Sequence, residues 1–217
     1  MAGSPGRSDT ESIGELRLVS RLSAGRKPKI GVLALQGAFR EHIAMLTKLG
    51  AVAHEVRTAA QLEDLDGLVI PGGESTTMGL LMEANGLVEP LRAFARERPI
   101  FGTCAGLIVL AAATAEGHQP LLGVLDVTVR RNAFGRQIRS FEAPVELYLV
   151  PGKQEIFHGI FIRAPWVEST GPGVEVVARC SERIVGVRQN HIVGVAFHPE
   201  LGEDPRLHAY FLELVAQ

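Results

Sequence analysis

Cys104 stands in the segment FGTCAGLIVLAA, residues 101–112, among small residues and between two apolar runs. The first run is typical of a β-strand and the second of a helix, so the cysteine falls at a strand-to-helix turn. Small neighbours there leave room for a substrate, and the first N–H groups of a helix favour a thiolate and can hold an oxyanion. Cys104 is therefore a candidate nucleophile, although a buried packing cysteine fits this stretch equally well.

A cysteine nucleophile needs a general base, and the segment GVAFHPEL supplies a histidine at the end of another apolar run. His198 and Glu200 are two residues apart, so in an extended chain their side chains leave the same face and the carboxylate can orient the ring. Alone, His-Pro-Glu also fits a solvated turn after a strand. Together with Cys104, it predicts a Cys104–His198–Glu200 triad.

The other histidines have no carboxylate at this spacing after a strand. We expect them on helices or loops and interpret them as structural: His42, His54, His118, His158, His191 and His208.

Two glycine-containing loops could complete a site. In GLVIPGGEST, Gly73 follows a strand, where backbone N–H groups can approach a substrate oxygen. The same stretch also fits a tight turn in which Ser75 or Thr76 caps the next helix. In LQG, Gln36 and Gly37 end the first strand, which fits either a peptide that reorients into the site or a simple turn at glycine.

These candidates need a scaffold, and the pattern of apolar residues predicts one. Strand and helix alternate three times, over residues 29–37 and 38–50, 67–73 and 74–86, and 98–104 and 105–117. After Gly117 the sequence is rich in strands, several of which must pair antiparallel. We expect an α/β fold: a single-domain, three-layer sandwich with a mostly parallel central sheet, plus antiparallel strands in the second half. Functional groups should gather at the carboxyl ends of the parallel strands.

Composition limits the partners. The 22 basic and 24 acidic residues are scattered and give a net charge of -2, which predicts no binding of nucleic acid or of an anionic membrane. Only two cysteines, Cys104 and Cys180, are present, so we expect no disulfide framework and a cytoplasmic protein, with Cys180 filling a strand. We find no spacing typical of a metal site and no cofactor motif.

Residues 1–28 contain no apolar segment of the length that a signal peptide or membrane span requires. We expect a flexible N-terminal tail over 1–28, unless residues 13–22 dock as a short helix, and a catalytic domain over 29–217.

Six separated segments carry a resemblance to a known family. Gly-Thr-Cys-Ala-Gly with a late His-Pro-Glu resembles the class I, triad-type glutamine amidotransferases. Within that class, the chain from about Lys29 onward resembles the family of glutaminase subunits of pyridoxal 5′-phosphate synthase, in the segments LALQGAFREH, IPGGESTTMG, FGTCAGLIVLA, RRNAFGRQIRSFEA, IFIRAP and FHPEL. The N-terminal 28 residues lie outside this resemblance.

The resemblance implies hydrolysis of L-glutamine to L-glutamate and ammonia through a glutamyl thioester. It assigns attack to Cys104, proton transfer to His198 and orientation of the ring to Glu200. It implies no cofactor in this chain, because the partner, a pyridoxal 5′-phosphate synthase subunit that receives the ammonia, carries the cofactor chemistry.

The resemblance also assigns the residues that contact substrate. They are Gly73 and Ala105 for the oxyanion hole, and Gly73, Glu74, Ser75, Arg131, Ile162 and Arg163 for glutamine. The Gln36–Gly37 peptide is implied to be regulatory, so that the oxyanion hole is complete only when the synthase docks.

Three other functions share some of these features. They are a glutaminase subunit of a different amidotransferase, a non-catalytic binding subunit of the same fold, and a cysteine peptidase with a related turn. The contexts GTCAGL and GGEST argue against the first, and the intact candidate triad argues against the second. Peptide cleavage without glutamine hydrolysis would indicate the third.

Overall fold

The computed structural model describes residues 26–131 and 140–217. Nearly all of the expected N-terminal tail therefore lies outside the described residues, and only its last three positions, 26–28, are described.

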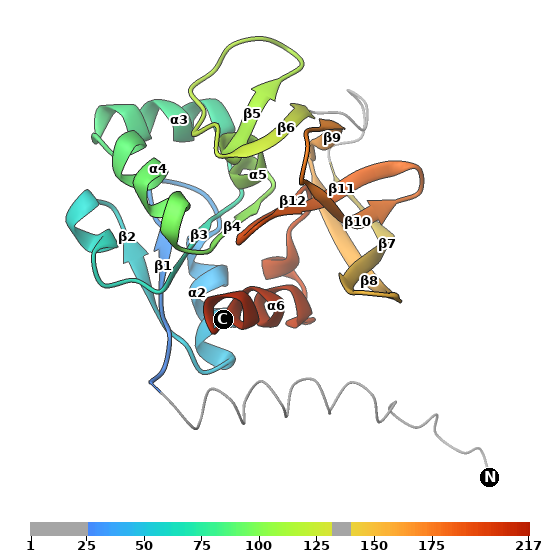
Figure 1. The fold of residues 1–217 in the computed structure, drawn as a ribbon, viewed down its shortest axis with the longest axis horizontal. Coiled ribbons are helices and arrows are strands. Elements are labelled where there is room, and N and C mark those ends of the chain that lie inside the picture. Colours follow the sequence, from blue (N-terminus) through green and yellow to red (C-terminus); the bar gives the residue numbers. More distant parts are fainter. Residues whose placement is uncertain (1–25, 132–139) are drawn as a thin grey trace.

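The helices and strands follow one another along the chain as shown in Figure 1. The strands are β1 (Lys29–Leu33), β2 (Val52–Val56), β3 (Gly67–Ile70), β4 (Ile100–Thr103), β5 (Ala111–Thr114), β6 (Leu125–Arg130), β7 (Ser140–Val150), β8 (Lys153–Ile162), β9 (Trp166–Thr170), β10 (Glu175–Cys180), β11 (Arg183–Gln189) and β12 (Ile192–Val195). The α-helices are α2 (Phe39–Lys48), α3 (Ser75–Ala84), α4 (Val88–Glu97), α5 (Ala105–Leu110) and α6 (Arg206–Val215), and two short 3₁₀ helices are η1 (Ala59–Leu62) and η2 (Pro199–Leu201).

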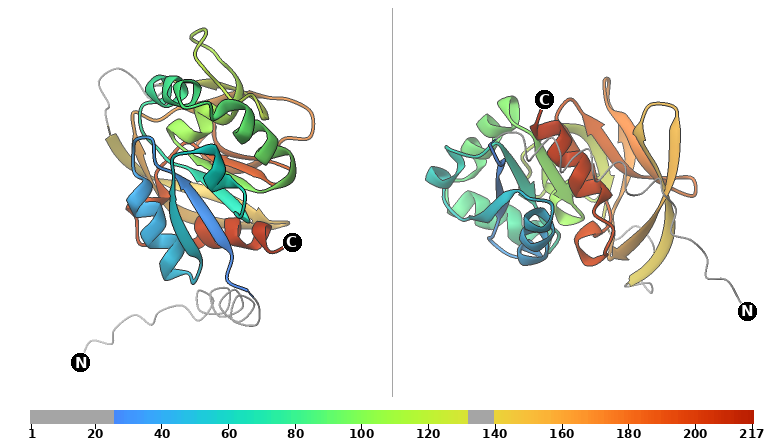
Figure 2. Two further views of the ribbon diagram at one scale, coloured as in Figure 1. Left: turned by 90° about the vertical axis from the view of Figure 1, so that its left-hand side faces the viewer. Right: turned by 90° about the horizontal axis from the view of Figure 1, so that it is seen from below.

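Half of the sheet is parallel, in the order β2-β1-β3-β4-β12. Every residue of β3, β4 and β12 is buried, as expected for strands covered on both faces. Helices α2 and α6 cover one face, and α3, α4 and α5 cover the other (Figures 1 and 2). Phe101 of β4 packs against Phe211 of α6, with 5.8 Å between ring centroids, so the sheet and this helix layer share one core.

The second half of the sheet is mostly antiparallel. From β12 the order continues β11-β10-β7-β8, and β9 joins β11 to the β5–β6 pair. The sheet therefore branches at β11 and curls away from the parallel half (Figure 2). The predicted α/β fold, with a three-layer parallel part and antiparallel strands later in the chain, is confirmed.

The helix expected over 105–117 was wrong in its length. Helix α5 ends at Leu110, and Ala111–Thr114 form strand β5. The carbonyl oxygens of Val109 and Leu110 accept hydrogen bonds from the N–H groups of Leu122 and Val124, at 2.7 and 3.0 Å, instead of from a further helical turn. A segment distant in sequence therefore ends the helix, which local periodicity cannot reveal.

Candidate active site

The loops that follow four parallel strands meet at one edge of the sheet. Strand β1 leads to Gln36, β3 to Gly73, β4 to Cys104 and β12 to His198. All four strands run in the same direction, so their carboxyl ends lie together. In an open parallel sheet this edge is where ligands bind.

Cys104 occupies a strained turn between β4 and α5, with φ 48° and ψ -102°. Positive φ at a residue other than glycine costs about 1–3 kcal/mol, so the surrounding structure must hold the turn in place. Gly106 makes this possible, because a Cβ there would lie 2.0 Å from the carbonyl oxygen of Ile70. The helix thus packs directly on the backbone of β3, as expected from the small residues around the cysteine.

His198 and Glu200 follow β12 and are almost completely buried. His198 Nδ1 lies 2.7 Å from Glu200 Oε1, so the carboxylate fixes the orientation of the ring. The backbone of His198 is held in turn by a 2.8 Å hydrogen bond from its N–H to the carbonyl of Ile160 in β8. The antiparallel half of the sheet therefore positions the histidine.

Cys104 and His198 face each other across Gly72. A Cβ at Gly72 would lie 2.3 Å from His198 Cε1 and 3.3 Å from Cys104 Cβ. Burial lowers the pKa of His198, but hydrogen bonds from the ring to Cys104 and Glu200 and the charges of both groups outweigh it and raise the pKa to about 10. The ring that faces the sulfur is therefore placed to exchange protons with the reacting groups.

A cavity of about 160 Å³ opens beside the cysteine. It is smaller than the ~300–1,000 Å³ typical of sites for drug-sized ligands, which suits a ligand of the size of an amino acid. The residues that line it are Gly73, Glu74, Ser75, Cys104, Ile108, Arg131, Ile162, Arg163 and His198.

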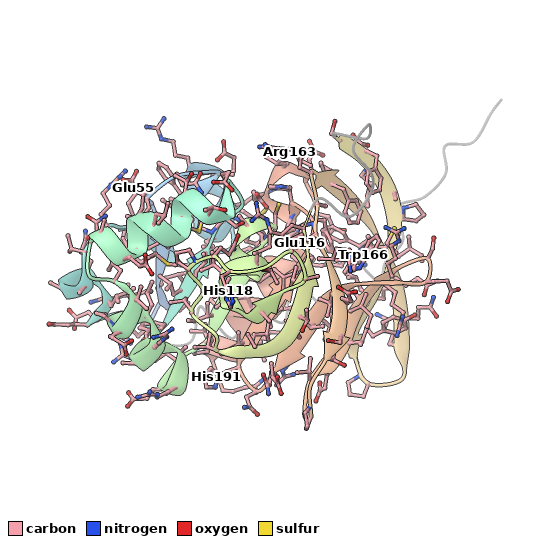
Figure 3. The ribbon with its side chains drawn as sticks, turned by 90° about the horizontal axis from the view of Figure 1, so that it is seen from above. Glu55, Glu116, His118, Arg163, Trp166 and His191 are labelled. Carbon is pink, nitrogen blue, oxygen red and sulfur yellow. The ribbon has the colours of Figure 1, made fainter. Side chains whose placement is uncertain are left out.

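The structure therefore brings the six expected glutamine-binding residues to one cavity with Cys104 and His198. Arg163 lies at the end of β8, between the helical half of the molecule and the β7–β8 hairpin (Figure 3). Ala105, expected in the oxyanion hole, is not one of the lining residues, although it directly follows Cys104 and begins α5.

Glu74 caps helix α3, rather than Ser75 or Thr76 as the alternative interpretation of the glycine loop had it. Its carboxylate accepts hydrogen bonds from the N–H groups of Thr76 and Thr77, at 3.1 and 2.8 Å. Burial raises the pKa of Glu74, but these bonds and those from the two threonine hydroxyls outweigh it and lower the pKa to about 2. One wall of the cavity therefore carries a permanent negative charge, which suits an ammonium group.

Arg131 brings a positive charge to the same cavity, and Gln119 holds it there. Arg131 Nη1 donates to Gln119 Oε1 at 2.6 Å, and Arg131 Nη2 lies 3.7 Å from Glu74 Oε1. The same Gln119 oxygen accepts from the hydroxyl of Ser75 at 3.3 Å. Sequence reasoning missed Gln119, which lies in no recognisable motif, and Ile108 of the cavity wall, which lies in the FGTCAGLIVLAA segment but was interpreted only as part of the apolar helix.

Gln36 ties the first-strand loop to the glycine loop. Its side chain donates from Nε2 to the carbonyl of Glu74 at 2.8 Å and accepts at Oε1 from the N–H of Glu74 at 3.2 Å. Gly37 has φ 89°, and a Cβ there would lie 1.8 Å from the carbonyl oxygen of Gly72. Both predicted regulatory residues therefore contact the loop that carries Gly73.

Two of the histidines interpreted as structural lie on strands, so their expected placement on helices or loops was wrong. His54 is on β2 and His158 is on β8. His158 Nε2 lies 2.6 Å from Glu142 Oε2 on the exposed surface of the β7–β8 hairpin, away from the cavity.

A wider cavity of about 650 Å³ is lined by charged residues of both signs, among them Arg26, Asp66 and Arg98. We place the chemistry in the smaller cavity because the smaller one contains the thiol and the histidine. Among residues 26–131 and 140–217, no three His, Cys, Asp or Glu side chains are grouped as metal ligands. No helix in these two ranges is long and apolar enough to cross a membrane.

A strained cysteine at the end of a parallel strand, facing a histidine–glutamate pair, is the arrangement expected of a class I glutamine amidotransferase. A solved structure described as a glutamine amidotransferase superposes with a TM-score of 0.81 and 51% identity, covering 87% of this chain and 99% of that one. The profile of the SNO glutamine amidotransferase family matches residues 32–217, and the chain belongs to that family.

Curated relatives agree with this assignment. The pyridoxal 5′-phosphate synthase subunit PdxT of Parafrankia sp. (strain EAN1pec) is 55% identical over 191 residues, 87% of this chain and 93% of the relative. PdxT of Desulforudis audaxviator is 52% identical over 188 residues, 86% of this chain and 98% of the relative. The solved structure of PurLQS from Thermotoga maritima shares the fold alone, with a TM-score of 0.65 and 18% identity over 88% of this chain and 98% of that one.

Proposed function

We propose that this chain hydrolyses L-glutamine with Cys104 as nucleophile, His198 as acid and base and Glu200 as the group that orients the histidine. We further propose that the ammonia is supplied to a pyridoxal 5′-phosphate synthase subunit. Membership of the SNO glutamine amidotransferase family and the PdxT relatives support this activity. The observation that carries the residue assignment is the buried pairing of His198 with Glu200 next to the strained Cys104.

In the first half of the reaction the Cys104 thiolate attacks the side-chain amide carbon of glutamine. The C–S bond forms as the C=O π bond opens, and the oxygen takes the negative charge. The tetrahedral intermediate then expels the nitrogen, to which protonated His198 donates its proton, so that ammonia leaves and a glutamyl thioester remains. The N–H groups of Gly73 and Ala105 stabilise the oxyanion in this proposal.

In the second half, neutral His198 takes a proton from water, and the resulting hydroxide attacks the thioester carbon. The C–S bond breaks, glutamate leaves, and the thiolate and the imidazolium are restored. Glutamine and water are therefore consumed and glutamate and ammonia are released, with no other reactant.

The charged walls of the cavity fit the two ends of the amino acid. The guanidinium of Arg131 matches the α-carboxylate in geometry and charge, and the carboxylate of Glu74 suits the α-ammonium group. With these ends held, the side-chain amide extends toward Cys104. Ser75, Ile162 and Arg163 complete the cavity around it.

Regulation by the partner acts through the Gln36–Gly37 segment in this proposal. Gln36 joins this segment to Glu74 by two hydrogen bonds, so a change in the first loop is passed to the neighbouring Gly73. Docking of the synthase reorients the segment and completes the oxyanion hole. We also propose that residues 29–217 form the glutaminase domain and that the protein works in the cytoplasm, in keeping with its free cysteines.

The test is release of ammonia from L-glutamine by the full chain, measured with and without the synthase. We expect low activity without the synthase, a strong rise with it, and loss of at least a thousandfold in Cys104→Ala. Cys180→Ala is the matched control, because burial raises the pKa of that thiol and it lies on β10, away from the cavity. Wild-type activity in Cys104→Ala would refute the proposal.

A further inference from the structure

Glu200 has a second carboxylate oxygen that the His198 contact does not use. Glu200 Oε2 is buried and makes no hydrogen bond within the geometric limit to any residue of the described ranges. Its near neighbour is His42 Nε2 of helix α2, at 3.4 Å, and both side chains are fully buried. A buried carboxylate oxygen without a donor is costly, so the group facing it matters.

The surroundings of His42 select one tautomer. His42 Nδ1 lies 2.9 Å from His208 Nε2 of helix α6, and His42 Nε2 lies 3.1 Å from the hydroxyl of Thr103 at the end of β4. If Nε2 were unprotonated, it could accept from the Thr103 hydroxyl, but its lone pair would also face the negative Glu200 oxygen. With the proton on Nε2, the ring offers that oxygen an N–H, and Nδ1 can accept the Nε2–H of His208.

The second histidine fits the same arrangement. If His208 donates from Nε2, its Nδ1 is a bare acceptor, and this atom is indeed buried with no partner within the described residues. The opposite tautomer would leave a buried N–H donor unsatisfied at that position. Burial lowers the pKa of His208 to about 3, so the ring is neutral and cannot carry a proton on both nitrogens at neutral pH.

Aromatic packing fixes both rings. Phe101 of β4 meets His42 and His208 edge to face, with centroids 6.3 and 5.7 Å apart. Burial, His208 and His198 all lower the pKa of His42, which keeps this ring neutral as well. The groups that face His42 are therefore Thr103 of β4, His208 of α6, and His198 and Glu200 near η2.

We propose that His42 is a positioning residue for the triad: its Nε2–H faces Glu200 Oε2 and holds the carboxylate in the orientation in which Oε1 accepts from His198. The role rests on the proposed function, since it acts only through Glu200. A neutral donor suits this task, because a cation at His42 would compete with His198 for the negative charge of the carboxylate.

The proposal gives the two ring nitrogens of His42 different roles, so a substitution that keeps a donor at the place of Nε2 can be compared with one that does not. The amide nitrogen of glutamine can reach the place of histidine Nε2, whereas asparagine reaches only the place of Nδ1. His42→Gln keeps a donor toward Glu200, and His42→Asn removes it while leaving a polar group near His208. His191→Gln is the control histidine, since His191 contacts the carbonyl of Ala95 and is far from Arg163 in Figure 3.

The first readout is steady-state glutamine hydrolysis by the full chain in the presence of the synthase. A hydrogen bond to a charged group corresponds to about 10- to 100-fold in rate, and the 3.4 Å contact between His42 Nε2 and Glu200 Oε2 is longer than such a bond, so the lower figure applies. We expect kcat of His42→Asn to fall by about that factor while KM changes less than about twofold, because the substrate cavity is untouched. We expect His42→Gln to recover most of the loss and His191→Gln to match wild type.

The second readout is alkylation of Cys104 by iodoacetamide as a function of pH, followed by mass spectrometry of the Cys104 peptide. A loosened Glu200 stabilises the His198 imidazolium less, so less thiolate forms near neutral pH. In His42→Asn we expect the midpoint of the alkylation profile to move upward by about one pH unit, which corresponds to a tenfold loss of that stabilisation. Loss of packing alone would lower the melting temperature and leave the midpoint in place.

A third measurement needs no variant. In the ¹⁵N-histidine-labelled full chain, long-range ¹H–¹⁵N spectra should show His42 as the neutral Nε2–H tautomer. An Nδ1–H tautomer would overturn the proposal, as would a folded His42→Asn with wild-type kcat and an unshifted alkylation profile. Failure of the proposed function is distinguished by Cys104→Ala: if that variant hydrolyses glutamine, the triad itself is wrong, whatever His42 does.

Discussion

Gly72 allows the two reacting side chains to approach each other, and replacing it by alanine tests this geometry directly. A Cβ at Gly72 would lie 2.3 Å from His198 Cε1 and 2.9 Å from His198 Nδ1. To reach an ordinary contact distance of 3.4 Å, the ring must retreat by about 1.1 Å from the new methyl group. The ring is buried and its Nδ1 is bound to Glu200, so it cannot simply rotate away.

A displacement of this size has a larger effect on catalysis than on folding. Misplacing a catalytic group by 1 Å costs about 100-fold in rate, equivalent to about 2.7 kcal/mol in activation free energy. A methyl group forced into a packed interior lowers the free energy of unfolding by about 1–3 kcal/mol. We therefore expect Gly72→Ala to remain folded, with kcat reduced about 100-fold or more and with glutamine binding retained.

The assay is a coupled measurement of glutamate production by the chain in complex with the synthase, together with thermal unfolding. Gly202→Ala is the matched control: a Cβ there would meet nothing closer than 3.9 Å, and it lies two residues after Glu200. We expect this variant to retain wild-type kcat. The reasoning is refuted if folded Gly72→Ala turns over glutamine within about threefold of wild type, because His198 and Cys104 would then not need the contact across Gly72.

Three further outcomes follow from other contacts. In urea titrations, His198→Gln should have a lower free energy of unfolding than wild type at pH 6, and the difference should shrink toward pH 10. The pKa of folded His198 is raised to about 10. The stabilisation that this histidine contributes is therefore full below about pH 6.5 and is lost as pH rises through 10. Arg131→Lys should raise KM for glutamine about tenfold with little change in kcat in the glutamate assay, since a single ammonium cannot reproduce the fork at the cavity; a fall in kcat alone would contradict this. Gly106→Ala should lower the free energy of unfolding by about 3 kcal/mol in urea titrations, because the new Cβ would lie 2.0 Å from the backbone oxygen of Ile70. Wild-type stability would contradict this and show that α5 can shift.

The sequence was sufficient to predict the parts of the site that depend on local chemistry. The order of strands and helices placed Gln36, Gly73, Cys104 and His198 at strand ends, and a parallel sheet necessarily gathers such ends at one edge. The small residues around Cys104 predicted a tight turn. The close approach of Gly106 to the backbone of Ile70 gives the steric reason for them.

Contacts between segments far apart in sequence were not predictable in this way. Gln119, in a loop without a motif, meets Ser75 from 44 residues earlier in the chain, and His42 meets Glu200 across more than 150 residues. His42 was interpreted as structural because it lies on a predicted helix and no carboxylate follows it at the spacing of His198 and Glu200 after a strand. Because His42 is buried, it lacks the exposure to solvent that usually indicates function. The network of side chains to which it belongs is visible only in the folded chain.

The site combines a rigid turn at Cys104 with a more weakly held loop at Gly73, and this difference indicates where a partner protein can act. The Cys104 turn is enclosed by the close approach of Gly106 to the backbone of Ile70 and of Gly72 to the side chains of His198 and Cys104, so moving it would require repacking the core. The loop that carries Gly73 is tied instead by two partly buried hydrogen bonds to the side chain of Gln36. Such bonds contribute about 1 kcal/mol each, which a docked protein surface can readily offset. We therefore propose that a docked synthase switches the loop at Gly73 without moving the Cys104 turn, so that turnover waits for the complex.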